Sequence, residues 1–322
     1  MKYVALPDMT IRRLPFYLAM EEYVARRYEE ELFFMWQVRP TVIFGRNQLM
    51  GSEVNLPYCY SHGIEVYRRK SGGGCVYADM DNIMFSYIVP CDDIVTTFSD
   101  YTSRIVAMLR GLGLDAASTG RNDILIDGRK VSGNAFYHIP GHSIVHGTML
   151  YSTDIENMTL AISPSETKLK SKGVSSVRSR ITTLNEHIGM SIEQFKHYSR
   201  QSLCDSEIRL TPDDVAGIER ISEMYYTDAW IYGHNPAYTT RVDRRIEGVG
   251  EFHTDIEVKS GIMKDINITG DFFLVGDIDE GILSHLRGKP YNAEAIEALA
   301  AEICTADVIV GLDNRKLVEI LI

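Results

Sequence analysis

The 322-residue sequence is poor in the features that mark secreted, membrane-spanning and zinc-bound proteins. It holds five cysteines, an odd number, and no Cys-x-x-Cys pair, so neither a disulfide framework nor a zinc knuckle is indicated. Its apolar runs, such as residues 272–275 and 307–310, are far shorter than the roughly 20 residues that cross a bilayer. The first residues have no signal-peptide pattern. We therefore expect a cytoplasmic protein without a membrane partner.

Several catalytic signatures are also missing. The sequence has no Walker loop ending in Gly-Lys-Ser/Thr, and no Gly-x-Gly-x-x-Gly before a predicted helix. It also lacks metal-ligand spacing, a hydrolase serine elbow and a glycosidase pair of carboxylates. These absences argue against P-loop nucleotidases, dinucleotide-binding enzymes, zinc enzymes and the common hydrolases.

Positive charge is scarce in the last third of the chain. The net charge is −11; residues 1–200 carry 22 Lys and Arg against 21 Asp and Glu, whereas residues 201–322 carry 11 against 23. An acidic C-terminal region disfavours nonspecific binding to nucleic acid, so we expect no nucleic-acid partner. A basic run stands out before it, comprising Lys168, Lys170, Lys172, Arg178 and Arg180. It is either a solvated surface or a patch for phosphate or for an acidic protein.

The periodicity of apolar residues predicts an α+β protein with two domains. Residues 1–242 are expected to form a large mixed β-sheet domain with flanking helices, and residues 243–322 a small α+β domain. Helices are predicted at 15–30, 99–111 and 292–303, and from the capping residues Ser191 and Thr211. Strands are predicted at 33–38, 41–45, 64–68, 76–77, 83–89, 124–127, 130–137, 144–151, 252–259, 262–269 and 307–310, with a polar loop at 238–247.

The segment 68–79 carries the strongest chemical signal. Arg68, Arg69 and Lys70 precede Ser71 and three glycines, Gly72–Gly74, between two predicted strands. Consecutive glycines let backbone N–H groups approach a ligand, commonly an anion, and arginines supply paired donors to phosphate or carboxylate. The alternative is a flexible hairpin loop with a solvated basic flank.

Three other polar segments accompany it. Lys130 and Ser132 are expected on one face of a strand, where an inward lysine would need an anion. Asp123 could hold magnesium beside a nucleotide or cap a turn. His146-Gly147-Thr148 places a glycine inside a strand, which often marks a close ligand, although a lone histidine is more often structural. Residues 45–48, Gly-Arg-Asn-Gln, are either a turn or part of a nucleotide or carboxylate pocket.

Together these segments resemble the lipoate–protein ligase family. The resemblance rests on Arg-Arg-x-Ser-Gly-Gly-Gly-x-Val-Tyr-x-Asp, on Asn-Asp-Ile followed by Lys-Val-Ser-Gly-Asn-Ala, and on His-Gly-Thr-Met-Leu. It extends to residues 172–180, to Trp-Ile-Tyr-Gly-His-Asn-Pro at 230–236 and to Gly-Asp-Phe-Phe at 270–273, and so covers the whole chain. It implies the fold of biotin and lipoate protein ligases, with a small C-terminal accessory domain.

The resemblance also implies a reaction in two steps. Lipoate attacks ATP, with magnesium, to give lipoyl-AMP; a lysine of an apo lipoyl domain, in a 2-oxoacid dehydrogenase E2 subunit or the glycine cleavage H protein, then takes the lipoyl group. Lys130 would act in both steps, Asp123 would hold nucleotide or magnesium, and no tightly bound cofactor is expected. The residues implied to bind ATP and the lipoyl adenylate are Arg68, Arg69, Ser71, Gly72, Gly73, Gly74, Cys75, Val76, Tyr77, Asn122, Asp123, Ser132, Gly133, Ala135, His146, Gly147 and Thr148.

Two alternatives remain open on the same fold. Octanoyl and lipoyl transferases of this superfamily carry the acyl group on a cysteine, expected after the His-Gly-Thr segment. No cysteine lies between Cys91 and Cys204, which disfavours a transferase, but Cys75 lies beside the glycine loop. The other alternative is a protein that binds lipoate or lipoyl-AMP without transferring it. Biotin ligation is disfavoured because the Gly-Arg-Gly-Arg loop of biotin ligases is absent.

Overall fold

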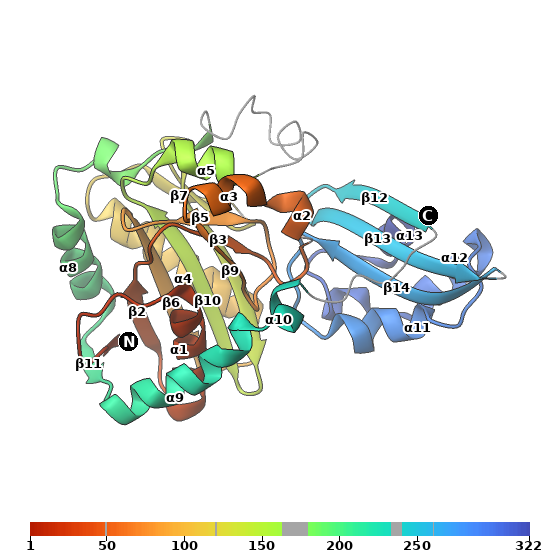
Figure 1. Cartoon of the computed structure of the whole chain (residues 1–322), viewed down its shortest axis with the longest axis horizontal. Coiled ribbons are helices and arrows are strands. Elements are labelled where there is room, and N and C mark those ends of the chain that lie inside the picture. Colours follow the sequence, from red (N-terminus) through yellow and green to blue (C-terminus); the bar gives the residue numbers. More distant parts are fainter. Residues whose placement is uncertain (49, 120, 163–179, 233–239, 260) are drawn as a thin grey trace.

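A mixed eight-stranded sheet is the largest unit of the chain (Figure 1). The computed structural model describes residues 1–322 except 49, 120, 163–179, 233–239 and 260. The sheet has the order β11-β1-β2-β6-β10-β9-β8-β7. Its strands β11, β1 and β2 are parallel, and all further pairs are antiparallel. The bounds are β1 Lys2–Ala5, β2 Leu32–Trp36, β6 Asn82–Val89, β7 Ala116–Ser118, β8 Asp123–Ile126, β9 Arg129–Ile139, β10 His142–Leu150 and β11 Ser206–Arg209.

Helices cover both faces of this sheet. On one face, α1 (Leu14–Arg27) and α9 (Pro212–Ser222) enclose a core built around Phe34 and Met84. On the other, α4 (Ile94–Arg110) and α8 (Ile192–Leu203) enclose a second core. The predicted caps of α8 and α9 are confirmed. Helix α4 begins earlier than predicted, because the Asp93 side chain accepts the Thr96 amide and caps it there.

A second, three-stranded sheet carries the glycine loop. Its order is β4 (Glu65–Arg68), β3 (Thr41–Phe44) and β5 (Val76–Ala78), so residues 69–75 connect its two outer strands. The short helices α2 (Met50–Glu53), α3 (Leu56–Ser61) and α5 (Ile155–Ala161) contribute to the core beside this sheet. A helix α10 (Asp228–Tyr232) follows α9, with 3₁₀ turns at Leu184–Glu186 and Glu223–Tyr226.

The small C-terminal domain is an antiparallel sheet packed on helices. The strands are β12 (Thr240–Ile246), β13 (Gly250–Lys259) and β14 (Ile262–Gly270). The helical segments are η3 (Asp279–Leu283), α11 (Ser284–Leu286), α12 (Ala293–Glu302), η4 (Thr305–Asp307) and α13 (Asn314–Leu321). Its own core includes the stacked rings of Phe252 and Phe272.

Two predictions about this domain are wrong. The segment 238–247 is not a loop: its residues 240–246 form β12, in which buried Val242 and Ile246 are separated by exposed Arg and Asp. Charged residues between buried apolar ones are typical of an edge strand whose outer face meets solvent. The predicted strand 307–310 is instead the end of a 3₁₀ turn followed by a single bridge from Ile309 to Leu274. Its apolar residues fill the domain core without pairing along a strand.

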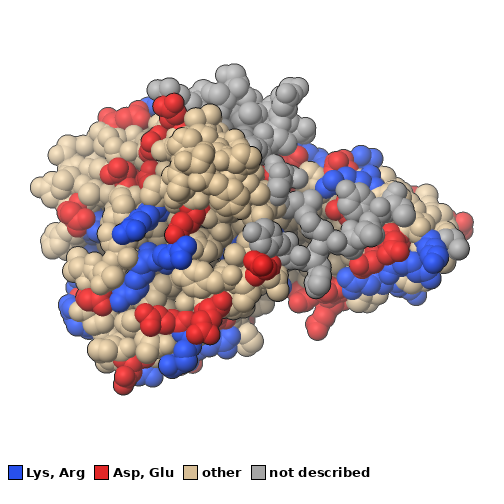
Figure 2. All heavy atoms as spheres, in the orientation of Figure 1, with Lys and Arg blue, Asp and Glu red and all other residues tan. Residues whose placement is uncertain are grey.

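The surface shows no single dominant charge on the face seen in Figure 2, where acidic and basic side chains are interspersed. Among the described helices, none is long and apolar enough to cross a membrane.

Candidate functional site

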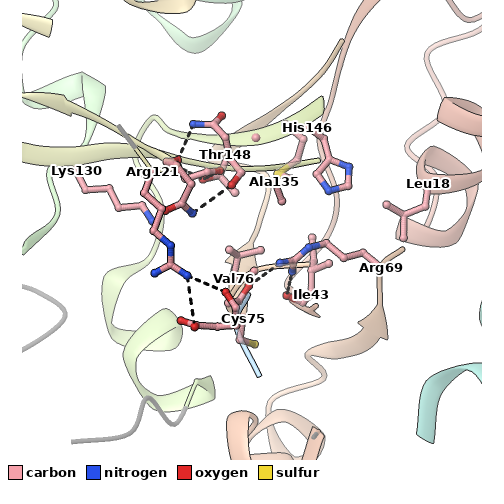
Figure 3. A pocket seen from close by; sticks show the side chains of 18 of the residues that line it. Leu18, Ile43, Arg69, Cys75, Val76, Arg121, Lys130, Ala135, His146 and Thr148 are labelled. Carbon is pink, nitrogen blue, oxygen red and sulfur yellow. Dashed lines mark hydrogen bonds and ion pairs between the residues drawn. The ribbon is translucent and has the colours of Figure 1, made fainter. Parts of the chain in front are cut away.

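A cleft lies between the two sheets of the N-terminal part, with α1 and the C-terminal domain at its margins. It encloses about 760 Å³ of empty space, part of which is open to solvent. In Figure 3, Lys130 and Arg121 reach into it from the side opposite Leu18 and Arg69. The topology therefore brings together segments that are more than 100 residues apart in the sequence.

Most residues predicted from the sequence line this cleft. They are Arg69, Gly73, Gly74, Cys75, Val76, Asn122, Lys130, Gly133, Ala135, His146, Gly147 and Thr148. Six others do not line it: Arg68, Ser71, Gly72, Tyr77, Asp123 and Ser132. The lining residues that were not predicted as site residues are Leu18, Trp36, Ile43, Met84, Arg121, Asn134, Arg180 and Asp271.

Arg69 holds the glycine loop in place. Its Nε donates to Ser71 Oγ (2.8 Å), one terminal nitrogen donates to Ile43 O (2.9 Å), and the other donates to the carbonyls of Gly72 (2.6 Å) and Gly74 (2.8 Å). The side chain is buried, and burial lowers the pKa of Arg69 to about 10. Most of its N–H groups are thus bonded to protein oxygens, and its guanidinium shapes the wall of the cleft.

Arg68 points to a different region. Its Nε donates to the carbonyls of Trp230 and Ile231, and its terminal nitrogen donates to carbonyls within residues 45–48. Residues 45–48 form a turn, closed by the side-chain carbonyl of Gln48, which accepts the Gly45 amide at 2.7 Å. Arg68 therefore ties this turn to α10, and neither it nor the turn lines the cleft.

Lys130 reaches the cleft because of an irregularity in β9. The register of β8 and β9 shifts, so that Ile124 pairs with Ser132 but Leu125 with Lys130. This bulge contradicts the expectation that Lys130 and Ser132 share a face. The Lys130 ammonium lies beside Gly133, in the space a β-carbon would fill. Ser132, whose hydroxyl donates to the side-chain oxygen of Asn134, does not line the cleft.

Asp123 bridges two cations. One carboxylate oxygen lies 2.7 Å from Lys130 Nζ, and the other is paired with Arg180. The carboxylate is buried, and its two partners retain partial exposure at the cleft. The arrangement places two cations side by side where an anionic ligand can reach them, with Asp123 fixing their positions.

This arrangement does not fit a resident magnesium site on Asp123. Both carboxylate oxygens already face cations, and the described residues contain no group of three His, Cys, Asp or Glu side chains that could hold a metal ion. Magnesium is coordinated by carboxylate, water and phosphate oxygens, and both carboxylate oxygens of Asp123 are already paired with Lys130 and Arg180.

The C-terminal domain contributes one wall of the cleft. Arg121 donates to the carbonyls of Val249 (2.8 Å) and Asp271 (2.9 Å), and lies 3.5 Å from the Asp271 carboxylate. The Gly73 amide donates to Phe272 O at 3.0 Å, and the Phe273 ring covers Gly73. These bonds seat residues 271–273 directly on the glycine loop.

The opposite end of the cleft is apolar. It is lined by Leu18, Trp36, Ile43, Val76 and Met84, which come from α1, β2, β3, β5 and β6. Apart from Val76, which belongs to the motif at 68–79, no local motif marks these residues, because each follows the ordinary apolar pattern of its own element. The cleft is thus cationic near Lys130 and hydrocarbon-lined near Trp36.

His146 lines the cleft, is almost fully buried and is part of a chain of hydrogen bonds. Its Nε2 lies 2.7 Å from Ser71 Oγ, and its Nδ1 lies 3.0 Å from both carboxylate oxygens of Glu21. Glu21 is fully buried in α1. No sequence motif marks Glu21, because other charged residues, such as Glu22 and Arg26, follow it on the same helix.

The cysteines differ sharply in their surroundings. Cys75 lines the cleft and is partly exposed. Cys204 lies at the end of α8, and burial raises its pKa to about 11, which disfavours a reactive thiolate.

Two sequence features lie outside the described residues. These are most of the basic run, Lys168, Lys170, Lys172 and Arg178, and the residues after Tyr232 in the segment 230–236. Of the basic run, only Arg180 is placed, and it lies in the cleft.

Comparison with known proteins identifies close similarity over the whole chain. Residues 14–203 match the model of the lipoyl protein ligase A/B catalytic domain, and residues 235–321 match that of the bacterial lipoate protein ligase C-terminus. Lipoate–protein ligase 1 of Staphylococcus aureus is 35% identical over 331 residues, with 100% of both chains covered.

Solved structures agree in fold. The structure of LipL1 from P. falciparum in complex with lipoate superposes with a TM-score of 0.75 at 20% identity, covering 100% of this chain and 98% of that one. A bipartite ligase from Thermoplasma acidophilum, whose structural study includes its E2 lipoyl domain, gives a TM-score of 0.64 at 26% identity, covering 74% of this chain and all of that one.

Proposed function

Because the chain belongs to the lipoate–protein ligase family, we propose that it activates lipoate with ATP and transfers the lipoyl group to lysines of apo lipoyl domains. The observation that carries this proposal is the division of one cleft into a hydrocarbon-lined end and a cationic end. Such a cleft matches a molecule with a long apolar acyl chain and a charged head that reacts.

The acyl chain would occupy the end formed by Leu18, Trp36 and Met84, which places its carboxylate toward Lys130. The nucleotide phosphates would face Lys130, Arg180 and Arg121. Arg121 supports this placement because its buried Nε has no hydrogen-bond partner among the described residues. A buried unpaired donor is costly unless a ligand satisfies it.

In the first step, a lipoate oxygen attacks the α-phosphorus of ATP, the bond to the β-phosphate oxygen breaks, and pyrophosphate leaves. Two anions must approach each other, so fixed cations at the cleft lower the barrier by offsetting their repulsion. Lys130 is placed for this role because Asp123 and the bulge in β9 hold its ammonium at the cleft.

In the second step, the amine of the acceptor lysine attacks the carbonyl carbon, AMP leaves, and the amine loses a proton. The protein supplies positioning and charge, and the nucleophile comes from the partner. An apo lipoyl domain is the partner we propose, from an E2 subunit or the glycine cleavage H protein. The Thermoplasma relative supports this, since its structural study names an E2 lipoyl domain.

Magnesium would enter with ATP as part of the substrate, because Asp123 is already engaged by Lys130 and Arg180. The ion would supply charge neutralisation at the phosphates when bound.

ATP–pyrophosphate exchange that depends on lipoate tests the first step directly. Wild-type protein should catalyse exchange without any acceptor, and Lys130→Ala should reduce it at least about 100-fold, the usual loss for a group that stabilises developing charge. Gel-shift or mass analysis with an apo lipoyl domain then tests the transfer. No lipoate-dependent exchange by folded wild-type protein would refute the proposal.

A thioester transferase remains the second candidate, because Cys75 lines the cleft. A thiol near cations can be acylated if its thiolate is stabilised. Cys75→Ala should leave exchange and transfer within about twofold of wild type if the ligase mechanism holds. Loss of transfer from an acylated carrier protein, without loss of exchange, would favour the thioester route.

We further propose that residues 1–242 form the catalytic domain and residues 243–322 the accessory domain, and that the protein works in the cytoplasm. The last strand of the first sheet ends at Arg209, which supports a division after it. Since β12 pairs with β13 from Thr240 onward, the structure favours a boundary just before Thr240, a few residues earlier than 242. None of the five cysteines, all of which lie in the described part of the chain, forms a disulfide, which is typical of a reducing compartment.

A further inference from the structure

A buried chain of hydrogen bonds runs from helix α1 to the glycine loop. It links the Glu21 carboxylate to His146 (3.0 Å), His146 to Ser71 (2.7 Å) and Ser71 to Arg69 (2.8 Å). Each of the four side chains is less than 5% exposed. Such a network is costly to bury unless every member is paired, and so it is expected to fix one geometry.

The groups that donate hydrogen bonds to Glu21 determine which atom donates at each step along this chain of hydrogen bonds. The Ser86 hydroxyl (2.6 Å) and the Tyr137 hydroxyl (3.2 Å) also lie within bonding distance of its carboxylate oxygens. An ionised carboxylate accepts only, so His146 donates from Nδ1 to Glu21. A neutral imidazole then accepts at Nε2 from the Ser71 hydroxyl, and Ser71 accepts from Arg69 Nε. Every donor in this arrangement has an acceptor.

At its Arg69 end, this chain of hydrogen bonds fixes the backbone of the glycine loop. Arg69, oriented by Ser71, binds the carbonyls of Gly72 and Gly74. Because the C=O and N–H of a trans peptide point in opposite directions, fixing these carbonyls also fixes the Gly73 amide, which donates to Phe272 O, and the Cys75 amide at the cleft. A loop whose geometry is set before the ligand arrives needs no reorganisation during reaction.

The order serine–histidine–glutamate is that of a hydrolytic triad, but this serine is not a nucleophile. Ser71 is fully buried, does not line the cleft and accepts a hydrogen bond from a guanidinium. An acyl carbon in the cleft cannot reach it without rearrangement of the loop.

We propose that Glu21 is a positioning residue for adenylation, acting through His146 and Ser71 on Arg69 and thereby on the glycine loop. This rests on the proposed function, since adenylation is the reaction whose anions the loop would meet. The Glu21 side chain does not line the cleft. It therefore acts on the glycine loop through His146 and Ser71, whereas Ser86 links it separately to Trp36.

Glu21→Gln is the decisive variant, because it keeps the shape but replaces one acceptor oxygen by a donor. Its amide can donate to His146 Nδ1, which forces the proton to Nε2 and reverses the bond to Ser71. We expect kcat of lipoate-dependent exchange to fall about 10-fold to 100-fold, the cost of a small misplacement of groups at the site. The KM for lipoate should stay within about twofold, because Ser86 still accepts the hydrogen bond from Trp36 Nε1 in the variant and so keeps that ring in place.

The matched control is Glu22→Gln, the same substitution one residue along the same helix. Among the described residues, the Glu22 side chain is hydrogen-bonded to Lys70 and Arg26 and to no member of the hydrogen-bond chain from Glu21 to Arg69. Its exchange kinetics should stay within about twofold of wild type. An equal loss of kcat in both variants would overturn the proposal, because a general weakening of α1 would explain it.

A double variant tests whether the effect of Glu21 on kcat passes through Ser71 or comes from a general loss of stability. Glu21→Gln added to Ser71→Ala should cost less than twofold further kcat, since the chain is already broken. Fully multiplicative losses would contradict transmission through Ser71.

The protonated nitrogen of His146 gives a readout that is recorded on the wild-type protein and needs no activity. ¹⁵N spectra of labelled wild-type protein, with His146 assigned by His146→Asn, should show a neutral ring protonated at Nδ1. A ring protonated at Nε2 would overturn the relay. Exchange by the wild type reports separately on the proposed function, so that the failure of one remains distinguishable from the failure of the other.

Discussion

The ammonium of Lys130 occupies the place where a side chain at Gly133 would begin: an ideal β-carbon on Gly133 would lie 2.5 Å from Lys130 Nζ. Glycine at this position is therefore required by the lysine and not by the backbone, whose φ is not in the left-handed region. Gly133 thus leaves room for the ammonium that Lys130, on the same strand, places at the cationic end of the cleft.

Gly133→Ala should displace the Lys130 ammonium while leaving the fold intact, because the end of a flexible side chain can move. We expect kcat of pyrophosphate exchange to fall about 10-fold or more, with unfolding free energy changed by less than about 1 kcal/mol. Steady-state exchange and chemical denaturation measure the two effects. Gly189→Ala is the control, since open space surrounds that glycine. Full activity of Gly133→Ala would contradict the placement of Lys130.

Asp123→Asn distinguishes a positioning carboxylate from a magnesium ligand. The variant removes the charge that holds Lys130 and Arg180, so we expect kcat of exchange to fall about 10-fold. The concentration of magnesium that gives half-maximal exchange should remain unchanged at saturating ATP. A severalfold increase in that concentration would show that Asp123 contacts the ion after all.

Arg121→Ala should loosen the contact between the C-terminal domain and the cleft. The variant leaves the carbonyls of Val249 and Asp271 without their donor and the buried Asp271 carboxylate without its cation. Bonds to charged groups contribute about 1.5–3 kcal/mol, so the melting temperature should fall by several degrees, as measured by calorimetry. Arg315→Ala is the comparison, because that residue is 90% exposed and should have little effect. Equal shifts in both variants would argue against a specific contact.

Stability at acid pH should depend on Glu22. Burial acts to raise its pKa, but hydrogen bonds and charge from Lys70 and Arg26 outweigh burial, and the net pKa is lowered from 4.5. The unfolded carboxylate then binds protons more readily than the folded one, so the stability from Glu22 is present above about pH 4.5 and is lost as pH falls through the folded pKa.

The unfolding free energies of wild type and Glu22→Gln should therefore converge as pH falls below about 4.5. At pH 7 the variant should be less stable by about 1–3 kcal/mol, since Lys70 loses its buried partner. Urea denaturation at several pH values measures the difference. A constant gap across the acid range would refute the linkage.

Local patterns were sufficient for much of the fold. Proline and capping residues mark the starts of α1, α8 and α9, because a helix leaves its first N–H groups unpaired and these residues satisfy or avoid them. The edge strand β12 escaped prediction because its exposed face is charged, so that only Val242 and Ile246 carry the buried pattern.

The two sheet-rich regions, the glycine loop between two strands and the cations close to it were predictable from the sequence, since these features depend on neighbouring residues. The roles of those cations depend on tertiary contacts. The fold directs Arg68 to α10 and Arg69 to the loop carbonyls, brings Glu21 from α1 to His146, and brings Arg121 and Asp271 from opposite domains to one cleft. A guanidinium or carboxylate takes its role from the partners within hydrogen-bond reach, and those partners lie far away in the chain.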